Sequence, residues 1–287
     1  MKKNILTVDA GVFLNLPVID TSLALEVHDV TAEAVEPVKQ KLKKLYGDIS
    51  VTADGKAADL NKLTPSAVVS VKPLVDFDKP RYNVADAMRV ISRLTQDEGG
   101  CPWDKAQTHE SIRVNMIEEA YEAVDAIDKR DVANMREEFG DVFLQSILQS
   151  DIARRSGEFD FDDVCDELCK KLIGRHTFIF GNDSAANADE ALNLWEKAKA
   201  IEKNYDSVKT QLARLPDNFP SLLLCQKTYR KIKKAGGSVD PKADLQKAIE
   251  SNDYVRAIAA CAALLVDGGV SAEVELNKLI KSAVEKL

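Results

Sequence analysis

The spacing of hydrophobic residues changes along the chain and divides it into three regions. In residues 1–80, short apolar runs rich in β-branched residues alternate with Gly and Pro breaks around one helical stretch at residues 32–45. The runs that predict strands are residues 5–8, 22–27, 49–52 and 67–71. This pattern predicts a small α/β unit, and residues 76–81 have the composition of a linker.

Residues 81–205 have helical periodicity almost throughout, with apolar positions three and four residues apart. The helices that this spacing predicts are residues 84–94, 108–128, 132–156, 161–175 and 187–203. Asp160 and Asn187 stand at the positions of helix N-caps. We therefore expect one helical domain over this region.

Residues 206–287 begin with a break that contains two prolines and then return to helical periodicity. The helices predicted there are residues 221–234, 242–251, 254–267 and 272–285. The expected fold class is therefore mainly α, with a small N-terminal α/β unit and two helical domains.

Composition and charge narrow the classes of partner. The formal net charge of −8 argues against nucleic acid or an anionic membrane as the main partner. A nucleotide substrate remains compatible, because a bound cation can reverse the local field. No apolar run approaches the roughly 20 residues of a membrane span. Asp9 interrupts the apolar start of the chain, so we expect a strand there rather than a signal peptide. The five cysteines are scattered along the chain, which favours a cytoplasmic protein with reduced thiols.

Two acidic pairs carry the candidate chemistry. Glu119 and Glu122 are three residues apart, as are Glu138 and Asp141, so each pair projects from one face of a helix. The connection between the two predicted helices is short, which makes them antiparallel neighbours. Four carboxylates around one point would be an oxygen-only site suited to Mg²⁺ or Mn²⁺.

The spacing alone also fits solvated acidic faces. A chain with 47 acidic residues contains several such pairs by chance. On the first helix, Val114, Ile117 and Tyr121 belong to an apolar face roughly opposite the acids, so those acids are also compatible with a solvent-exposed surface.

The second helix favours the metal site. Its acidic stripe continues into Leu148 and Ile152, so this helix is expected to be buried nearly all round. A carboxylate held there needs a cation or hydrogen-bond donors. A di-iron or di-manganese bundle with Glu-x-x-His motifs is excluded, because none of the three histidines follows an acid by three residues.

Basic and aromatic residues form a second candidate set. Lys171 and Arg175 are four residues apart and are compatible with phosphate binding or with neutralising the end of a helix. Trp195 and Lys199 repeat that spacing on the next helix, where a core position for the indole is the more common outcome.

The loop before the first acidic helix contains Trp103 and Gln107. These two side chains are compatible with closure over a substrate, and a purely structural anchor fits the sequence equally well.

Together these motifs resemble MazG-type nucleoside triphosphate pyrophosphohydrolases. The resemblance rests on four segments: Gly-Cys-Pro-Trp-Asp at 100–104, Glu-Glu-x-x-Glu at 118–122, Glu-Glu-x-Gly-Asp at 137–141, and Lys171 with Arg-His at 175–176. It implies an all-α helical bundle that works as a homodimer and hydrolyses nucleoside triphosphates to the monophosphate and pyrophosphate with Mg²⁺.

The resemblance also implies roles for individual residues. The implied metal ligands are Glu119, Glu122, Glu138 and Asp141. The adjacent acids that would assist or orient a water are Glu118 and Glu137. The implied triphosphate-binding pair is Lys171 and Arg175, and the pocket would be completed by Trp195 and Lys199, with Trp103 and Gln107 from the loop. One departure is that Thr177 and Phe178 replace a Pro and a second His of the family pattern.

The flanking regions show weaker resemblances. Residues 206–287 resemble a degenerate second copy of the domain, whose only acidic pair three apart, Glu250 and Asp253, straddles a predicted turn. Residues 1–80 resemble the end of a tetrapyrrole-methylase domain without a glycine-rich cofactor loop, so methyl transfer is not expected.

Two alternatives to this enzyme stay open. One is a non-catalytic regulatory or interaction protein on the same scaffold. The other is an enzyme of the same superfamily that acts on dUTP or phosphoribosyl-ATP. The loop at residues 100–104 resembles that of MazG proteins and so points away from both of these substrates.

Overall fold

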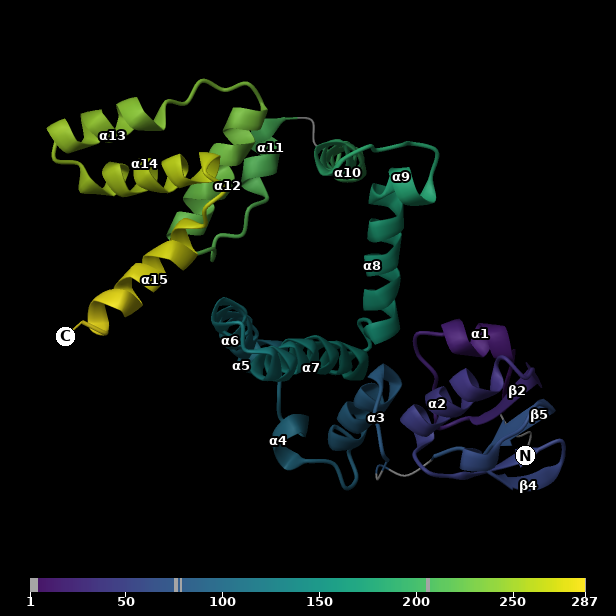
Figure 1. Ribbon diagram of the computed structural model, residues 1–287. Coiled ribbons are helices and arrows are strands. Elements are labelled where there is room, and N and C mark those ends of the chain that lie inside the picture. Colours follow the sequence, from purple (N-terminus) through teal and green to yellow (C-terminus); the bar gives the residue numbers. More distant parts are fainter. Residues whose placement is uncertain (1–4, 75–76, 78, 205–206, 287) are drawn as a thin grey trace. The chain divides into compact units, whose positions relative to one another are not determined.

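The computed structural model describes residues 5–74, 77, 79–204 and 207–286 (Figure 1). These residues form two compact units, 1–168 and 169–287, and each is described by itself. The predicted boundary between residues 205 and 206 lies outside the described residues, as do residues 76 and 78 of the predicted linker. The mainly helical fold with a small N-terminal sheet is confirmed.

The N-terminal sheet has the strand order β1-β2-β5-β3-β4, with β1 and β2 parallel and the other pairs antiparallel. Its elements are β1 (Ile5–Asp9), α1 (Ala10–Asn15), β2 (Ala24–Val30), α2 (Val35–Tyr46), β3 (Ser50–Ala53), β4 (Lys56–Asp59) and β5 (Ser66–Val71). Phe13, Val27 and Leu42 are fully buried between the helices and the sheet.

The sequence pattern misses α1 and β4. Strand β4 is four residues long and contains no β-branched residue, so it lacks the usual strand composition. It is held by a tight turn at Asp54 and Gly55, which both have positive φ, and this turn pairs β4 with β3. Pairing therefore decides its conformation.

A buried ion pair anchors the first helix of the helical region, α3 (Val84–Leu94). The Nζ atom of Lys79 lies 2.6 Å from Oδ1 of Asp86 and 2.9 Å from Oγ1 of Thr21. Asn83 caps the helix and donates to the carbonyl oxygen of Ile19, 2.5 Å away. These contacts join the start of α3 to the segment that precedes β2, within the same compact unit.

The helices that follow are α4 (Pro102–Lys105), α5 (His109–Ile112), α6 (Asn115–Lys129), α7 (Val132–Ser156) and α8 (Phe161–Arg175). The prediction of one helix over 108–128 is wrong, because a turn at residues 113–114 separates α5 from α6. Asp160 accepts from the backbone N–H groups of Asp162 and Asp163, which confirms it as the N-cap of α8. The hydrophobic core of this region is formed by residues of α3, α5 and α7, among them Ile91, Ile112 and Ile147.

The remaining helices are α9 (Thr177–Phe180), α10 (Ala188–Glu202), α11 (Val208–Ala213), α12 (Ser221–Lys234), α13 (Pro241–Glu250), α14 (Tyr254–Asp267) and α15 (Ala272–Val284). The predicted N-cap Asn187 accepts from the N–H of Glu190. Gln226 is buried and links three segments, since its amide donates to the carbonyls of Ala262 and Val270 and accepts from the N–H of Ala272.

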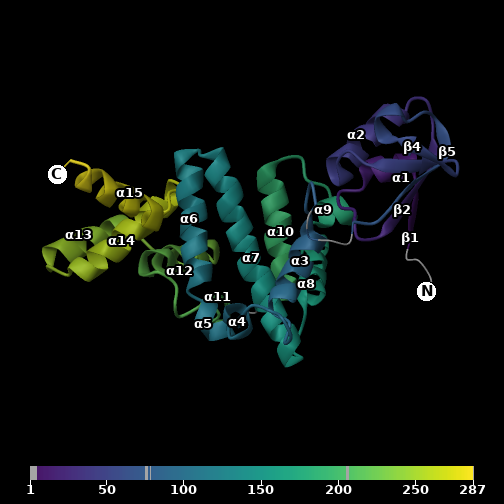
Figure 2. The same ribbon diagram turned by 90° about the horizontal axis from the view of Figure 1, so that it is seen from below.

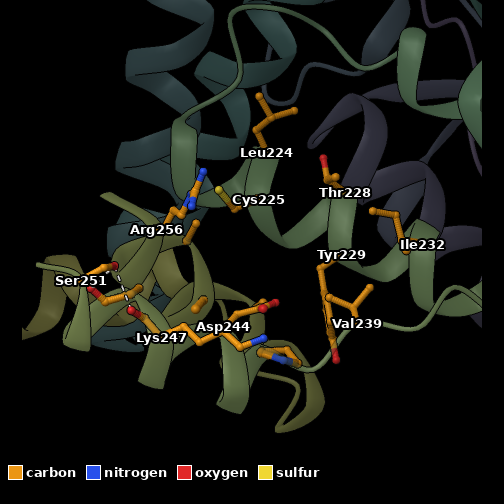
Figure 3. Close-up of a pocket in the computed structure, with 15 residues that line it drawn as sticks. Leu224, Cys225, Thr228, Tyr229, Ile232, Val239, Asp244, Lys247, Ser251 and Arg256 are labelled. Carbon is orange, nitrogen blue, oxygen red and sulfur yellow. Dashed lines mark hydrogen bonds between the residues drawn. The ribbon is translucent and has the colours of Figure 1, made fainter. Parts of the chain in front are cut away.

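A cavity of about 690 Å³ lies between α12, α13 and α14. Figure 3 shows Cys225, Thr228 and Ile232 from α12 on one side of it, with Lys247 from α13 on another. Among the described residues, no single helix has the length and apolar composition of a membrane span, and α14 with α15 meets that test only as a sharply bent pair.

Candidate functional site

The hairpin of α6 and α7 brings the acidic residues together. The two helices pack against each other and run side by side in Figure 2. Arg130 adopts the left-handed conformation that ends α6, and Asp131 caps α7 by accepting from the N–H groups of Ala133 and Asn134. This short reversal makes the helices antiparallel and places the first turns of α7 beside the middle of α6.

Three of the four predicted ligands form one cluster. Carboxylate oxygens of Glu119, Glu122 and Glu138 all lie within 4.8 Å of one another. Asp141 is outside that group of three, but its charge acts on both Glu119 and Glu138. The structure therefore brings three of the four predicted ligands together and leaves Asp141 near enough for its charge to act on them.

Burial and like charge raise the pKa of two of these carboxyls. Burial is the largest cause for Glu119, followed by the charges of Asp141, Glu122 and Glu138. Burial is again the largest cause for Glu138, followed by the charges of Glu122 and Asp141. A divalent cation would remove this repulsion, and an oxygen-only donor set fits Mg²⁺ or Mn²⁺.

The apolar surroundings of the cluster differ from the expectation. Glu138 is buried, but Phe139 and Val142 beside it are exposed, so the prediction that α7 is buried nearly all round is wrong for its first half. On α6, Ile117 and Tyr121 are also about half exposed. Periodicity identifies an apolar stripe, but it does not identify what covers that stripe.

Glu118 and Glu137, the predicted water-orienting acids, are both exposed. The charge of Glu118 acts on Glu119, and that of Glu137 acts on Glu138. Both carboxylates are therefore accessible to water and near enough for their charges to act on the cluster.

The loop before α4 is fixed by backbone contacts. A side chain at position 100 would lie 2.2 Å from the carbonyl oxygen of Gln96, so only glycine fits there. Gln107 donates to the carbonyl oxygen of Trp103 and accepts from the hydroxyl of Ser111, each at 2.8 Å. Trp103 is 58% exposed, so its indole is available to a ligand and is not a core anchor.

The predicted basic and aromatic residues lie in the unit 169–287. The Arg175 guanidinium carbon is 5.2 Å from the centre of the Trp195 ring, and Nζ of Lys199 is 4.8 Å from it. Trp195 is half-buried and stacks on two cations. Lys171 is exposed on α8.

Arg175 has a carboxylate partner that the sequence analysis missed. Its Nε and Nη2 atoms donate to the two carboxylate oxygens of Glu202 at 2.7 and 3.0 Å. The hydrogen bond from Arg175 is the largest cause that lowers the pKa of Glu202 to about 2. The available signal was spacing, because Glu202 follows Trp195 by seven residues and Lys199 by three on one stripe of α10.

Gln145 is a second residue that the sequence analysis missed. It follows Glu138 by seven residues and Asp141 by four, so it lies on the same stripe of α7. It is 5% exposed, and its side-chain oxygen has no hydrogen-bond donor among the described residues. An acceptor buried in this way is available to a ligand that donates a hydrogen bond.

The candidate site residues are divided between the two units. The acidic cluster belongs to the unit 1–168, and Lys171, Arg175, Trp195 and Lys199 belong to the unit 169–287. The cavity between α12, α13 and α14 is lined by none of these candidate residues.

Known proteins match the central part of the chain. The model of the MazG nucleotide pyrophosphohydrolase domain matches residues 107–180, which contain the whole acidic cluster. The nucleoside triphosphate pyrophosphohydrolase of Escherichia coli K12 is 36% identical over 149 residues, which is 52% of this chain and 57% of that protein. The match thus spans little more than half the length of that relative.

Two other relatives extend the comparison. An uncharacterized 26.1 kDa protein of Streptomyces cacaoi is 34% identical over 168 residues, which is 58% of this chain and 67% of that protein. The crystal structure of a mazG-related protein from Thermotoga maritima covers 40% of this chain and 98% of its own, at 26% identity and a TM-score of 0.36. The family model and the Escherichia coli relative together identify residues 107–180 as a MazG nucleotide pyrophosphohydrolase domain, so the protein is of the MazG type.

Proposed function

We propose that this protein is a Mg²⁺-dependent nucleoside triphosphate pyrophosphohydrolase. The observation that carries the proposal is the convergence of Glu119, Glu122 and Glu138 within 4.8 Å, with Asp141 acting on the same cluster. The family match and the name of the Escherichia coli relative support this activity. Mn²⁺ has the same preference for oxygen ligands and is the alternative cation.

The proposed reaction is the hydrolysis of one phosphoanhydride bond. Water adds across the bond between the α- and β-phosphates, which yields the nucleoside monophosphate and pyrophosphate and releases a proton. A bound cation would neutralise charge on the phosphate oxygens. Glu118 or Glu137 would accept the proton of the attacking water, because both are exposed beside the ligand positions.

The basic and aromatic residues would bind the substrate. Lys171 and Arg175 supply positive charge for the triphosphate, and Trp195 with Lys199 completes that set. Trp103 supplies an exposed ring from the loop, and the Gln107 amide holds that loop in shape. In this assignment the acidic residues would hold the cation, and the basic residues would hold the phosphates.

We also propose that the protein works as a homodimer. Many apolar side chains of the α6–α7 hairpin are exposed: Met116, Ile117, Tyr121, Val124, Ile127, Phe139, Val142 and Phe143. An apolar surface of this extent in a water-exposed protein is typical of a protein interface.

The flanking regions have supporting roles in this proposal. We assign residues 1–80 to an α/β unit, 81–205 to the catalytic domain and 206–287 to a degenerate second helical domain. Glu250 ends α13 and Asp253 precedes α14, so a turn separates the acidic pair of the last region. We therefore assign that region a packing or regulatory role. We also propose that the protein is cytoplasmic.

Pyrophosphate release from a panel of ribo- and deoxyribonucleoside triphosphates, with and without Mg²⁺, tests the proposal. Glu138→Gln should lower the rate by about 100-fold or more, the scale for loss of one electrostatic group at a reaction centre. Glu98→Gln, which removes one charge from an exposed loop outside the cluster, is the matched control. No pyrophosphate from any nucleotide would favour a non-catalytic regulatory protein instead.

A further inference from the structure

We propose that Glu202 is an internal competitor for the phosphate-binding edge of Arg175 and must release it when a polyphosphate binds. The inference rests on the proposed function, because it concerns the arginine assigned there to the triphosphate. It adds a residue that lowers the affinity for substrate in the free protein.

The geometry of the pair is that of guanidinium–phosphate recognition. Glu202 accepts two parallel hydrogen bonds from Nε and Nη2 of Arg175, at 2.7 and 3.0 Å. A phosphate with two oxygens would use the same planar edge and the same bidentate pattern. The carboxylate therefore occupies one of the two edges with which Arg175 can bind a phosphate.

The charge of Arg175 is compensated as well. Its side chain is only 8% exposed and packs over the Trp195 ring, so the ion pair is screened weakly on the arginine side. The low pKa of Glu202, about 2, means that the competing carboxylate is ionised at any physiological pH. A polyphosphate must overcome this charge whichever edge of Arg175 it approaches.

Three features favour the release of Glu202. Its side chain is 38% exposed, so water can solvate the carboxylate when it leaves. It is the last residue of α10, where the negative end of the helix dipole disfavours a carboxylate. Lys203 offers a second cation, with Nζ 3.2 Å from Oε1 of Glu202.

The binding of inorganic tripolyphosphate, measured by isothermal titration calorimetry on the full chain, tests the inference. Glu202→Gln should bind this anion about three- to tenfold more tightly than the wild type, the scale for removing one partly exposed competing charge. Glu202→Asp should fall between the two, because the shorter side chain holds the guanidinium less well. For the nucleotide, KM should fall with little change in kcat.

Glu196→Gln is the charge-matched control. It removes one carboxylate from the same helix, and that carboxylate is paired with Lys234 rather than with Arg175. Its affinity for tripolyphosphate should equal that of the wild type. Combining Arg175→Gln with Glu202→Gln should abolish the gain, since the gain depends on the arginine.

Weaker binding by Glu202→Gln would overturn the inference and make Glu202 a positioning residue for Arg175. Equal gains in Glu202→Gln and Glu196→Gln would overturn it as well, because the effect would then come from net charge. Absence of tripolyphosphate binding by Glu202→Gln has the same consequence. Since this assay requires no hydrolysis, its outcome is independent of whether any nucleotide is cleaved.

Discussion

Glu119→Gln should change the stability of the protein in opposite directions with and without a divalent cation. In the absence of metal, the substitution removes a half-buried charge that has other carboxylate oxygens within 4.8 Å. At that separation two like charges repel by about 1 kcal/mol at the dielectric of water, which is the appropriate choice for a side chain that is partly solvated. The variant should therefore gain about 1 kcal/mol of unfolding free energy in EDTA.

With metal the order should reverse. A cation at 100 times its dissociation constant stabilises the folded state by about 2.7 kcal/mol, and a tenfold weaker site loses about 1.4 kcal/mol of that. Wild type should therefore gain more from Mg²⁺ than the variant gains. Urea unfolding followed by far-UV circular dichroism, in EDTA and in saturating Mg²⁺, measures both differences, and Glu98→Gln should show neither.

The effect in EDTA should also depend on pH. Because burial and neighbouring carboxylates raise the folded pKa of Glu119, its ionised form opposes folding above that pKa. The advantage of Glu119→Gln should be full at neutral pH and should disappear as the pH falls through the folded pKa. An equal response of both proteins to Mg²⁺, or a variant that is less stable in EDTA, would refute the reasoning.

Three further predictions concern stability and assembly. Asp86→Asn should cost about 3–5 kcal/mol at neutral pH, because it leaves Lys79 buried without its charge partner. Burial raises the pKa of Asp86, but hydrogen bonds from Lys79 and Arg89 outweigh that effect, so the net pKa is lowered. The stability cost of Asp86→Asn, measured by urea unfolding, should therefore shrink as the pH falls below about 4. Gln145→Leu should raise the unfolding free energy by about 1–3 kcal/mol, and a loss would show that the amide has a partner within the fold. Tyr121→Lys should shift the protein from dimer to monomer in sedimentation velocity, and an unchanged dimer would place the interface elsewhere.

The Arg175–Glu202 pair and the acidic cluster behave in opposite ways in the proposed enzyme. The acidic residues repel one another and are relieved by a cation. Arg175 is already neutralised by a carboxylate and must exchange it for a phosphate. Binding of a cation at the acidic cluster and of a phosphate at Arg175 both depend on electrostatic attraction. Raising the salt concentration should therefore weaken both.

Local sequence patterns were enough to predict which acidic side chains share a helix face at the site. A spacing of three between acids and a short reversal between two helices suffice to bring Glu119 and Glu138 to one place, because α-helical periodicity and antiparallel packing are local rules. The N-caps Asp160 and Asn187 were predictable for the same reason, since a cap depends on the next three residues only.

The partners of these side chains and their burial depend instead on contacts between distant parts of the chain. Glu202 reaches Arg175 from 27 residues further along the chain, and no local pattern specifies which carboxylate an arginine meets. Strand β4 forms because β3 pairs with it, although its own composition is poor for a strand. The apolar surface of α6 and α7 follows the predicted periodicity, yet it remains exposed in the single chain. Spacing fixes which side chains share a face, whereas contacts between distant segments fix what that face meets.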